Sequence, residues 1–564
     1  MRRGLAQRKF GRRSYLPSSA LLIALIFLSP ATSSSATRHE RQIDSWKPLN
    51  YNVTLTFNDE LTEIKNARTE ITIATLRDQV SILDLDFGEM TVDSVSVNSR
   101  ATQFEHPAEL LKVKLPQTVG KGAQLVIVVV YHGKPKDGLI LSNDKDGKPA
   151  AVGDNWPDRV HQWIPCLDHP SAKATVSFTV TAPERDLVVA NGRLDRTENT
   201  ANATRTWTYT ESMPIPPYCM IVAVGEFAKL ESNKPAVTPL SYYVPKSDSR
   251  LAIPGFAPAA PSLKLFSETV APYPYEKLAL IVGATRFGGM ENSSAIVFTS
   301  SLFSSRANQP MSRVFNIRSG IVDVVAHEVA HQWFGDSVTE STWSDLWLSE
   351  GFATYFAGLF IEKYEGEAVF RDYMKRAADT YFSYEKQTRT PIHDTDTEDL
   401  FKLLNANNYQ KGAWVLHMLR SRLGDEAFFR GLRAYYNAHK NSTATTEDLR
   451  AALEEASGVN LGEFFARWVY GTGHPQYELS WEWNSEKSLM TLHLDQLQPE
   501  PSFPNWLSAD VTTANGQRRV VFKPTGKKTI EELHLDQAPV SIQVDPDSTV
   551  LKEVTVKLAA KAKP

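Results

Sequence analysis

Cysteine is scarce in this chain, with only Cys166 and Cys219 among 564 residues. So small a number excludes a fold held together by a framework of disulfides. Both cysteines lie in apolar stretches, where an unpaired buried thiol is the commoner state of a lone cysteine. We therefore expect two free thiols, with a disulfide between them as the alternative if the chain folds in an oxidising compartment.

A hydrophobic run long enough to anchor the chain in a membrane is also missing. The run ALLIALIFL, at residues 20–28, is too short to span a bilayer. It follows a basic segment and precedes small residues that end at Ala36, which is the order of a secretory signal peptide. We therefore expect residues 1–36 to be a signal, with a weak twin-arginine element in RRSYL. The mature protein is predicted to be soluble, without a membrane span, and secreted or periplasmic.

A strong charge of one sign is absent as well. The chain has 61 basic and 65 acidic residues and a formal net charge of −4. Residues 1–36 contain six basic and no acidic residues, so the mature chain is at about −10. No basic cluster stands out in it, which argues against nucleic acid as a partner.

Alternation of apolar and polar residues dominates the chain up to about residue 245. In YNVTLTF, the apolar residues Tyr51, Val53, Leu55 and Phe57 occupy every second position, which is the period of a half-buried strand. Similar stretches recur and are separated by clusters of Gly and Pro. These patterns predict an all-β amino-terminal domain over residues 37–245.

Helical spacing follows the loop at residues 254–262. A first helix is predicted within residues 319–336, with Gly335 as its C-cap, and a second within residues 346–366, apolar on most sides and therefore buried. Period two returns near residue 477, and Asn515-Gly516 is a hairpin signal. We expect a helix-rich domain over residues 246–470 and a small β-sandwich over residues 471–564.

The stretch HEVAHQWFGD contains the clearest chemical signal. His327 and His331 are four residues apart, so they lie one turn above each other on one helix face and can bind one tetrahedral zinc ion. Glu328 is displaced by about 100° around the helix and faces the open position of the ion. Glu350, on the next helix, can supply the third ligand. The alternative is a structural histidine pair without metal, because HExxH also arises by chance.

The HExxH motif, the eighteen intervening residues and the glutamate of WLSEGFA resemble the gluzincin metallopeptidases, specifically the aminopeptidase N and leukotriene hydrolase family. FGGMEN at residues 287–292 resembles the exopeptidase motif of that family, and YQKGA at residues 409–413 resembles its catalytic-tyrosine motif. The resemblance covers nearly the whole mature chain. It implies an all-β amino-terminal domain, a thermolysin-like α+β catalytic domain and a β-sandwich. In a departure from the family, we expect this chain to lack the large helical domain that many relatives carry after the sandwich.

The resemblance also implies roles for individual residues. One zinc ion per chain is bound by His327, His331 and Glu350. Glu328 acts as general base, taking a proton from water and delivering it to the leaving amine. Tyr409 donates its hydroxyl to the developing oxyanion. The expected activity is that of a zinc-dependent aminopeptidase.

The GGMEN motif is expected to select peptides with a free amino terminus. The Glu291 carboxylate pairs with a protonated α-amine and penalises an internal peptide, whose amide cannot neutralise it. Gly288 and Gly289 leave room for the substrate backbone to approach. Met290 and Asn292 complete this substrate-binding segment, and Met290 either lines the pocket for the first side chain or belongs to the core.

The stretch DNWPDRVHQWIPC departs from the family pattern. Relatives often carry a Gln or Glu shortly before the Pro-Cys pair as a second anchor for the amine, and this chain does not. Either Asn155 or Asp158 substitutes for it, or Glu291 works with less help. Two other functions remain open at this point: the epoxide hydrolase activity of leukotriene hydrolases, which uses the same zinc site, and peptide binding by a catalytically inactive protein.

Overall fold

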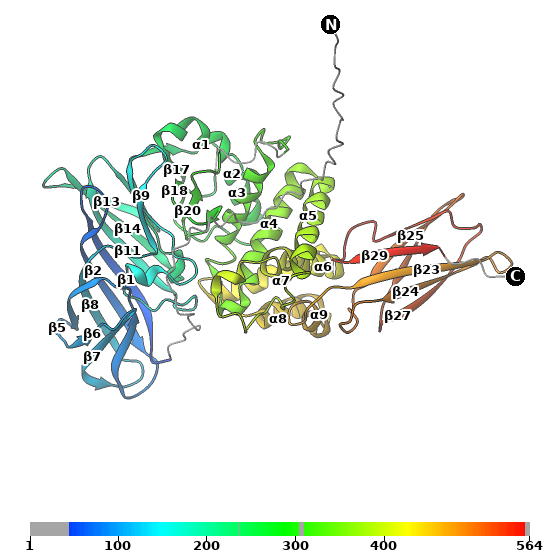
Figure 1. Cartoon of the computed structure of the whole chain (residues 1–564), viewed down its shortest axis with the longest axis horizontal. Helices are drawn as coiled ribbons and strands as arrows, with labels where there is room; N and C mark the ends of the chain where they lie inside the picture. The colour runs from blue at the N-terminus through cyan, green and yellow to red at the C-terminus, as the bar shows by residue number, and fades with distance from the viewer. Residues whose placement is uncertain (1–43, 235, 304–309, 559–564) are drawn as a thin grey trace, which may run out of the picture.

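Three regions follow one another along the chain in the computed structural model, which describes residues 44–558 except 235 and 304–309. A β-rich amino-terminal region and a smaller carboxyl-terminal β region flank a helical middle region (Figure 1). The predicted signal peptide, residues 1–36, lies outside the described residues. Within the described part, no helix combines the length and the apolar character needed to cross a bilayer.

The largest sheet of the amino-terminal region has eight strands in the order β13-β14-β11-β1-β2-β8-β4-β5. In β1, Tyr51, Val53, Leu55 and Phe57 are buried while the residues between them are not, so the predicted half-buried strand is confirmed. The strands are β1 (Trp46–Phe57), β2 (Ile64–Thr75), β4 (Thr91–Val97), β5 (Arg100–Ala101), β8 (Gln124–Gly133), β11 (Ala174–Pro183), β13 (Arg193–Thr200) and β14 (Thr204–Ile215).

Two smaller sheets complete this region, in the orders β3-β7-β6 and β12-β15-β10-β9. Cys166 and Cys219 are both buried and are not joined by a disulfide, as the sequence predicted. The strands are β3 (Val80–Asp86), β6 (Phe104–Glu105), β7 (Leu110–Val119), β9 (Leu139–Asn143), β10 (Pro149–Gly153), β12 (Leu187–Ala190) and β15 (Val222–Gly225), and two 3-10 turns accompany them, η1 (Val160–Gln162) and η2 (Pro217–Cys219).

A five-stranded sheet, in the order β16-β17-β18-β20-β19, opens the middle region. Its first two strands precede residue 246, where the sequence suggested that the middle domain begins. They belong to this sheet because β17 pairs in parallel with the buried strand β18. The strands are β16 (Phe227–Glu231), β17 (Leu240–Pro245), β18 (Leu278–Gly283), β19 (Gly289–Met290) and β20 (Ala295–Thr299).

Helices make up most of the rest of the middle region. The long helix after the HExxH segment is buried along its first fifteen residues, as its apolar sequence predicted. The helices are α1 (Ser249–Gly255), α2 (Ala259–Thr269), α3 (Ser319–His331), α4 (Trp347–Glu365), α5 (Glu367–Glu385), α6 (Gly412–Leu423), α7 (Asp425–His439), α8 (Thr446–Ser457) and α9 (Gly462–Trp468), with the 3-10 turns η3 (Lys246–Asp248), η4 (Trp343–Asp345) and η5 (Leu400–Leu403), the π-helical turn η6 (Asn407–Lys411) and the short strands β21 (Val338–Glu340) and β22 (Ser442–Ala444).

The helix that contains HExxH ends earlier than the sequence suggested. α3 stops at His331, and Gly335 lies beyond it instead of capping it. The backbone N–H of Asp336 donates to the carbonyl of His331, and Gly335 adopts a φ of 121°. The chain therefore turns back toward His331 over residues 332–336. The left-handed conformation at Gly335 is one that favours glycine.

Two small sheets form the carboxyl-terminal region, in the orders β27-β24-β23-β29 and β26-β25-β28. The predicted hairpin is present, with Ala514 and Asn515 between the paired residues Thr513 and Gly516. The apolar side chains of these sheets continue the core of the middle region. The strands are β23 (Gln476–Asn484), β24 (Leu489–Gln496), β25 (Leu507–Thr513), β26 (Gly516–Phe522), β27 (Lys528–His534), β28 (Ser541–Val544) and β29 (Glu553–Leu558).

The amino-terminal and middle regions share both apolar and polar contacts. Trp156 and Tyr218 from the first region pack in one apolar cluster with Met290 and Trp343 from the second. Lys173 also reaches across this boundary. Its ammonium donates hydrogen bonds to the carbonyls of Asp336, Ser337 and Ser442 and to the hydroxyl of Thr339, over distances of 2.7 to 3.2 Å.

Candidate active site

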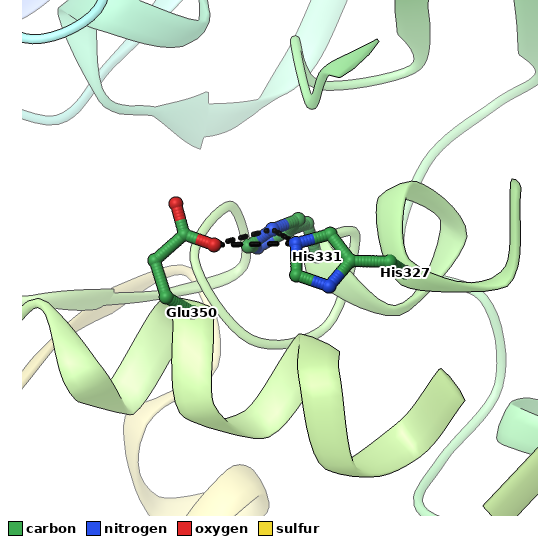
Figure 2. Close-up of side chains that lie close together, drawn as sticks. All are labelled: His327, His331 and Glu350. Atoms are coloured by element: carbon green, nitrogen blue, oxygen red, sulfur yellow. Dashed lines mark hydrogen bonds and ion pairs between the residues drawn. The ribbon is translucent and has the colours of Figure 1, made fainter. Parts of the chain in front are cut away.

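Two helices bring the three predicted metal ligands together. His327 and His331 come from α3 and Glu350 from α4 (Figure 2). The two Nε2 atoms are 3.0 Å apart, and Oε2 of Glu350 lies 3.2 Å from Nε2 of His327 and 3.4 Å from Nε2 of His331. Donors bound to a tetrahedral zinc ion by bonds of about 2.0–2.1 Å stand about 3.3 Å apart. The residues and their spacing therefore fit zinc.

The far side of the His331 ring determines which nitrogen can bind a metal. Its Nδ1 lies 3.1 Å from the carbonyl oxygen of Phe334 and 3.0 Å from the hydroxyl of Ser349. A carbonyl oxygen can only accept, so in the neutral ring Nδ1 carries the proton and donates it there. The lone pair of Nε2 then faces His327 and Glu350, which is the tautomer that a metal ligand needs.

Buried charge is concentrated around these donors. Burial raises the pKa of Glu328 well above its ordinary value; His331 opposes this, and the carboxylates of Glu291 and Glu350 add to it. Burial also raises the pKa of Glu291, to about 7. For Glu350 burial acts in the same direction, yet the two histidines outweigh it and hold its pKa below the ordinary value. Buried carboxylates at such close quarters favour the binding of cations.

The GGMEN segment lies beside the metal donors. Ligand atoms of Glu291, Glu328 and His331 all lie within 4.8 Å of one another. Gly288 has open space where a Cβ would be, as expected for backbone approach. The space at Gly289 is already taken, because a Cβ there would stand 2.3 Å from Oε1 of Glu328. Gly289 therefore accommodates the Glu328 carboxylate, a contact that the sequence did not suggest.

The other two residues of that segment are buried. Met290 is 1% exposed and packs in the apolar cluster with Trp156, so it also belongs to the core. Asn292 is fully buried, and its side-chain nitrogen donates to the carbonyl of Met290 over 3.4 Å. Its backbone carbonyl accepts from the backbone N–H of Ala295. Asn292 thus closes the turn that follows Glu291.

Tyr409 lies next to the metal donors on a π-helical turn. Its ring is parallel to that of His327, with centroids 5.9 Å apart. Burial and the Glu350 carboxylate raise the pKa of Tyr409 well above its ordinary value, so its hydroxyl keeps its proton. The turn comes close to α4 because Gly351 and Gly412 face each other, and a Cβ on Gly351 would stand 3.0 Å from the backbone of Gly412.

Neither residue suggested as a second amine anchor joins this group. Asn155 is fully buried, its amide nitrogen donates to the carbonyl of Met220 and its oxygen accepts from the indole of Trp163, so it has a structural role. Asp158 is partly exposed and belongs to neither cluster of candidate metal-binding groups among the described residues. The acidic neighbour of Glu291 from this stretch is instead Asp154, whose negative charge contributes to the raised pKa of Glu291.

Asp154 was missed because its sequence context gives no sign of its contacts. It is fully buried and accepts hydrogen bonds from the hydroxyl of Thr285, 3.1 Å away, and from the guanidinium of Arg159. Thr285 immediately precedes the segment that leads into GGMEN.

Two models of one protein family match the chain. The peptidase M1 N-terminal domain matches residues 47–219, and the peptidase family M1 domain matches residues 258–468. The second match contains the metal donors, the GGMEN segment and Tyr409.

Curated relatives and solved structures agree with these matches. The chain is 28% identical over 406 residues to probable aminopeptidase 1 of Saccharolobus solfataricus, an alignment that covers 70% of this chain and 50% of the relative. It is similar to the M1 zinc metallopeptidase from Deinococcus radiodurans, with 25% identity, a TM-score of 0.64 and coverage of 76% of this chain and 95% of that one.

The fold extends over most of a further structure. Aminopeptidase A of Legionella pneumophila, in complex with aspartic acid, superimposes with a TM-score of 0.79 at 16% identity and covers 92% of this chain and 60% of its own. The chain spans about half the length of the curated relatives it matches. With two family models that together match most of its described residues, the chain belongs to peptidase family M1.

Proposed function

We propose that this chain is a zinc-dependent aminopeptidase that removes the first residue from peptides with a free amino terminus. The observation that carries the proposal is the position of the Glu291 carboxylate, whose ligand atom lies within 4.8 Å of those of Glu328 and His331. An anion at this distance from the reacting groups can bind the α-amine of a substrate whose first peptide bond lies at the metal.

One zinc ion per chain is proposed, held by His327, His331 and Glu350. When bound, zinc polarises a carbonyl oxygen and lowers the pKa of a coordinated water. The donor triangle with sides of 3.0 to 3.4 Å supports this assignment. The name of the Deinococcus radiodurans relative, a zinc metallopeptidase, also supports it.

Glu328 is the proposed general base. Its carboxylate adjoins the donors without being one of the three, and its Oε2 is buried without a hydrogen-bond partner among the described residues. A carboxylate in this environment binds a proton readily, because burial raises its pKa. It takes the proton of the attacking water and transfers it to the nitrogen of the leaving peptide.

Tyr409 and Glu291 bind different groups of the substrate, the oxygen of the scissile carbonyl and the α-amine. The Tyr409 hydroxyl, which keeps its proton, donates a hydrogen bond to the oxygen that becomes negative in the transition state. The Glu291 carboxylate binds the protonated amine one residue upstream, and Gly288 leaves space for the peptide backbone between them. An internal peptide would leave Glu291 buried and unpaired, which costs binding energy.

The chain is proposed to work outside the cytoplasm, after removal of residues 1–36 as a signal. We further propose a thermolysin-like catalytic domain and a terminal β-sandwich that begins near residue 471. The first domain boundary is best placed near Phe227 instead of 246, because β16 and β17 share a sheet with β18. Sheet membership, and not the change in sequence pattern, supports this boundary.

The proposed function is tested with one peptide whose amino terminus is either free or acetylated. Acetylation removes the positive charge and leaves Glu291 facing a neutral amide, so kcat/KM should fall by about a hundred- to several-thousandfold. Glu291→Ala should lower kcat/KM on the free peptide by a similar factor and narrow the gap between the two peptides. A wild-type enzyme that cuts both peptides equally, or that cuts internal bonds of a protein, is an endopeptidase and contradicts the proposal.

A further inference from the structure

Gln332, the residue after the second histidine, connects both sides of the site. Its side chain is fully buried and makes hydrogen bonds at both ends of the amide. The nitrogen Nε2 lies 3.0 Å from the carbonyl oxygen of Glu291 and 2.8 Å from Oδ2 of Asp336. The oxygen Oε1 lies 2.8 Å from the backbone nitrogen of Ser294 and 3.1 Å from the hydroxyl of Tyr273.

The partners fix the orientation of this amide. The Glu291 carbonyl can only accept and the Ser294 N–H can only donate, so a flipped amide would place like groups against each other at both ends. Two donors and two acceptor positions are all in use, although the Tyr273 hydroxyl is shared with the carbonyl of Lys277. A buried amide with every position satisfied holds its partners more firmly than a single contact would.

The backbone at Glu291 depends on this amide because the sheet ends just before it. Strand β19 comprises only Gly289 and Met290, which pair with β20. The carbonyl of Glu291 therefore lies past the end of the ladder and is bound instead by Gln332. Ser294, three residues later, is bound by the other end of the same amide, so this amide holds both ends of the turn from Glu291 to Ser294. Asn191 and Lys277 donate to the carbonyls of Ser293 and Ser294, and neither of them binds the Glu291 end.

We propose that Gln332 is a positioning residue for the amine-binding segment: its amide fixes the Glu291–Ser294 turn against the end of α3, and thereby sets where the substrate amine binds relative to the metal donors. The proposal rests on the proposed aminopeptidase function. A purely structural role for Gln332, as a stabiliser of the end of α3, makes a different prediction, since it concerns His331 and the metal instead of Glu291.

Gln332→Met and Gln332→Glu test this directly. Methionine has a similar length and removes all four hydrogen bonds, whereas glutamate keeps the shape and directs an acceptor at the Glu291 carbonyl and the Asp336 carboxylate. Tyr273→Phe is the matched control, because it removes a hydroxyl from the same amide but leaves both bonds from Nε2. Both Gln332 variants should raise KM for the free peptide by about tenfold and change kcat by less than about threefold. Tyr273→Phe should leave KM within about twofold of the wild type.

Two further measurements separate the outcomes. Zinc content should be unchanged in all variants, and amide hydrogen exchange in residues 287–294 should be faster in both Gln332 variants but not in Tyr273→Phe. Hydrogen exchange needs no substrate. It therefore tests whether the Gln332 amide holds the Glu291–Ser294 turn even if the wild-type enzyme fails to distinguish free from acetylated peptides. Loss of zinc with KM unchanged, or exchange in residues 287–294 equal to that of the wild type, would overturn the proposal in favour of a structural role. If Gln332→Met does not fold, Gln332→Glu alone decides by the same criteria.

Discussion

The proposed metal-binding and amine-binding sides of this site are constructed in different ways. Two histidines and a glutamate project from helices of 13 and 19 residues, whose own hydrogen bonds fix the direction of each side chain. Glu291 follows a strand of only two residues and is held by the side chain of Gln332. One side obtains its geometry from local periodicity and the other from contacts between segments far apart in the chain.

This difference has a consequence for how substitutions act. A helix tolerates the loss of one side chain without losing its course, so changes on the metal side should alter chemistry and leave the backbone in place. The turn at Glu291 has few backbone bonds of its own, so changes to its buried neighbours should move it. The catalytic steps should therefore be most sensitive on the helical side, and substrate selection on the other.

The largest effect is expected at Glu328, on the helical side. Glu328→Gln removes the base but keeps the size of the side chain and all three metal donors, so kcat should fall by several orders of magnitude with zinc retained. Kinetics and zinc content by emission spectroscopy check this together. His331→Ala is the matched control and should lose the metal. Loss of zinc in Glu328→Gln would instead show that Glu328 is a metal ligand, and chemistry and metal binding could then not be changed separately on the helical side.

Tyr409 should show the next largest effect. Tyr409→Phe keeps the ring parallel to His327 and removes only the hydroxyl, so kcat should fall by about a hundredfold while KM changes little. Steady-state kinetics on a free-amine peptide provide both values. A rise in KM at unchanged kcat would instead make Tyr409 a substrate-positioning residue, a role that we expect only on the amine-binding side.

Glu211 should make the stability of the amine-binding side depend on pH, because it supports the far end of the amine-binding turn. Its carboxyl accepts a hydrogen bond from the Ser294 hydroxyl over 3.0 Å. Burial, helped by nearby Glu276, raises the pKa of Glu211 to about 8 from an ordinary value of 4.5. Between these values the folded protein keeps a proton that the unfolded chain releases, so this contribution to stability is full below pH 4.5 and is lost as the pH rises through 8.

Glu211→Gln cannot ionise and should remove that dependence. The wild-type free energy of unfolding should fall between pH 5.5 and 8.5 by on the order of 1–3 kcal/mol more than that of the variant. Urea denaturation at both pH values measures it. Glu268→Gln, at an exposed ion pair with Lys264 on α2, is the control and should behave as the wild type. Equal pH dependence in Glu211→Gln and wild type would exclude Glu211 as the source.

The smallest effect is expected where the two sides touch. Gly289→Ala places a methyl group 2.3 to 2.5 Å from Oε1, Cδ and Cγ of Glu328, so the side chain of the proposed base must shift from Cγ outward. We expect a decrease in kcat of about tenfold, because the carboxylate is displaced and not removed, with unchanged discrimination against acetylated peptides. Kinetics on both peptides test this. A loss as large as that of Glu328→Gln would mean that the carboxylate has no other usable position.

The sequence predicted the helical side well because its signals are local. The spacing of His327 and His331 determines their common face, and the two Nε2 atoms indeed lie 3.0 Å apart. Glu350 was a candidate from its place on the next helix and Tyr409 was assigned by resemblance, and both lie beside the histidines. The π-helical turn under Tyr409 was not predicted, and neither was the close contact of Gly351 with Gly412 beside it, because these glycines are far apart in sequence.

The amine-binding side was predicted less completely. Asn155 was a candidate for the second anchor, yet its amide is used by Met220 and Trp163, and no local pattern reveals such partners. Gln332 and Asp154 were missed for the same reason. The overall order of β, helical and β regions followed from periodicity. The pairing of β17 with β18, on which the proposed shift of the first boundary rests, is a contact that composition does not reveal.

Lys173 has a further consequence for the choice of a fragment that could be expressed alone or joined to another protein. Its ammonium, supplied by the amino-terminal region, binds three carbonyls and a hydroxyl in the turn after α3 and in the short strands β21 and β22. A fragment that begins at the middle region would leave those oxygens without their donor, among them the carbonyl of Asp336, whose own N–H donates to the carbonyl of His331. The unit that can be expressed, shuffled or grafted onto another scaffold is therefore the catalytic region together with the β-region before it.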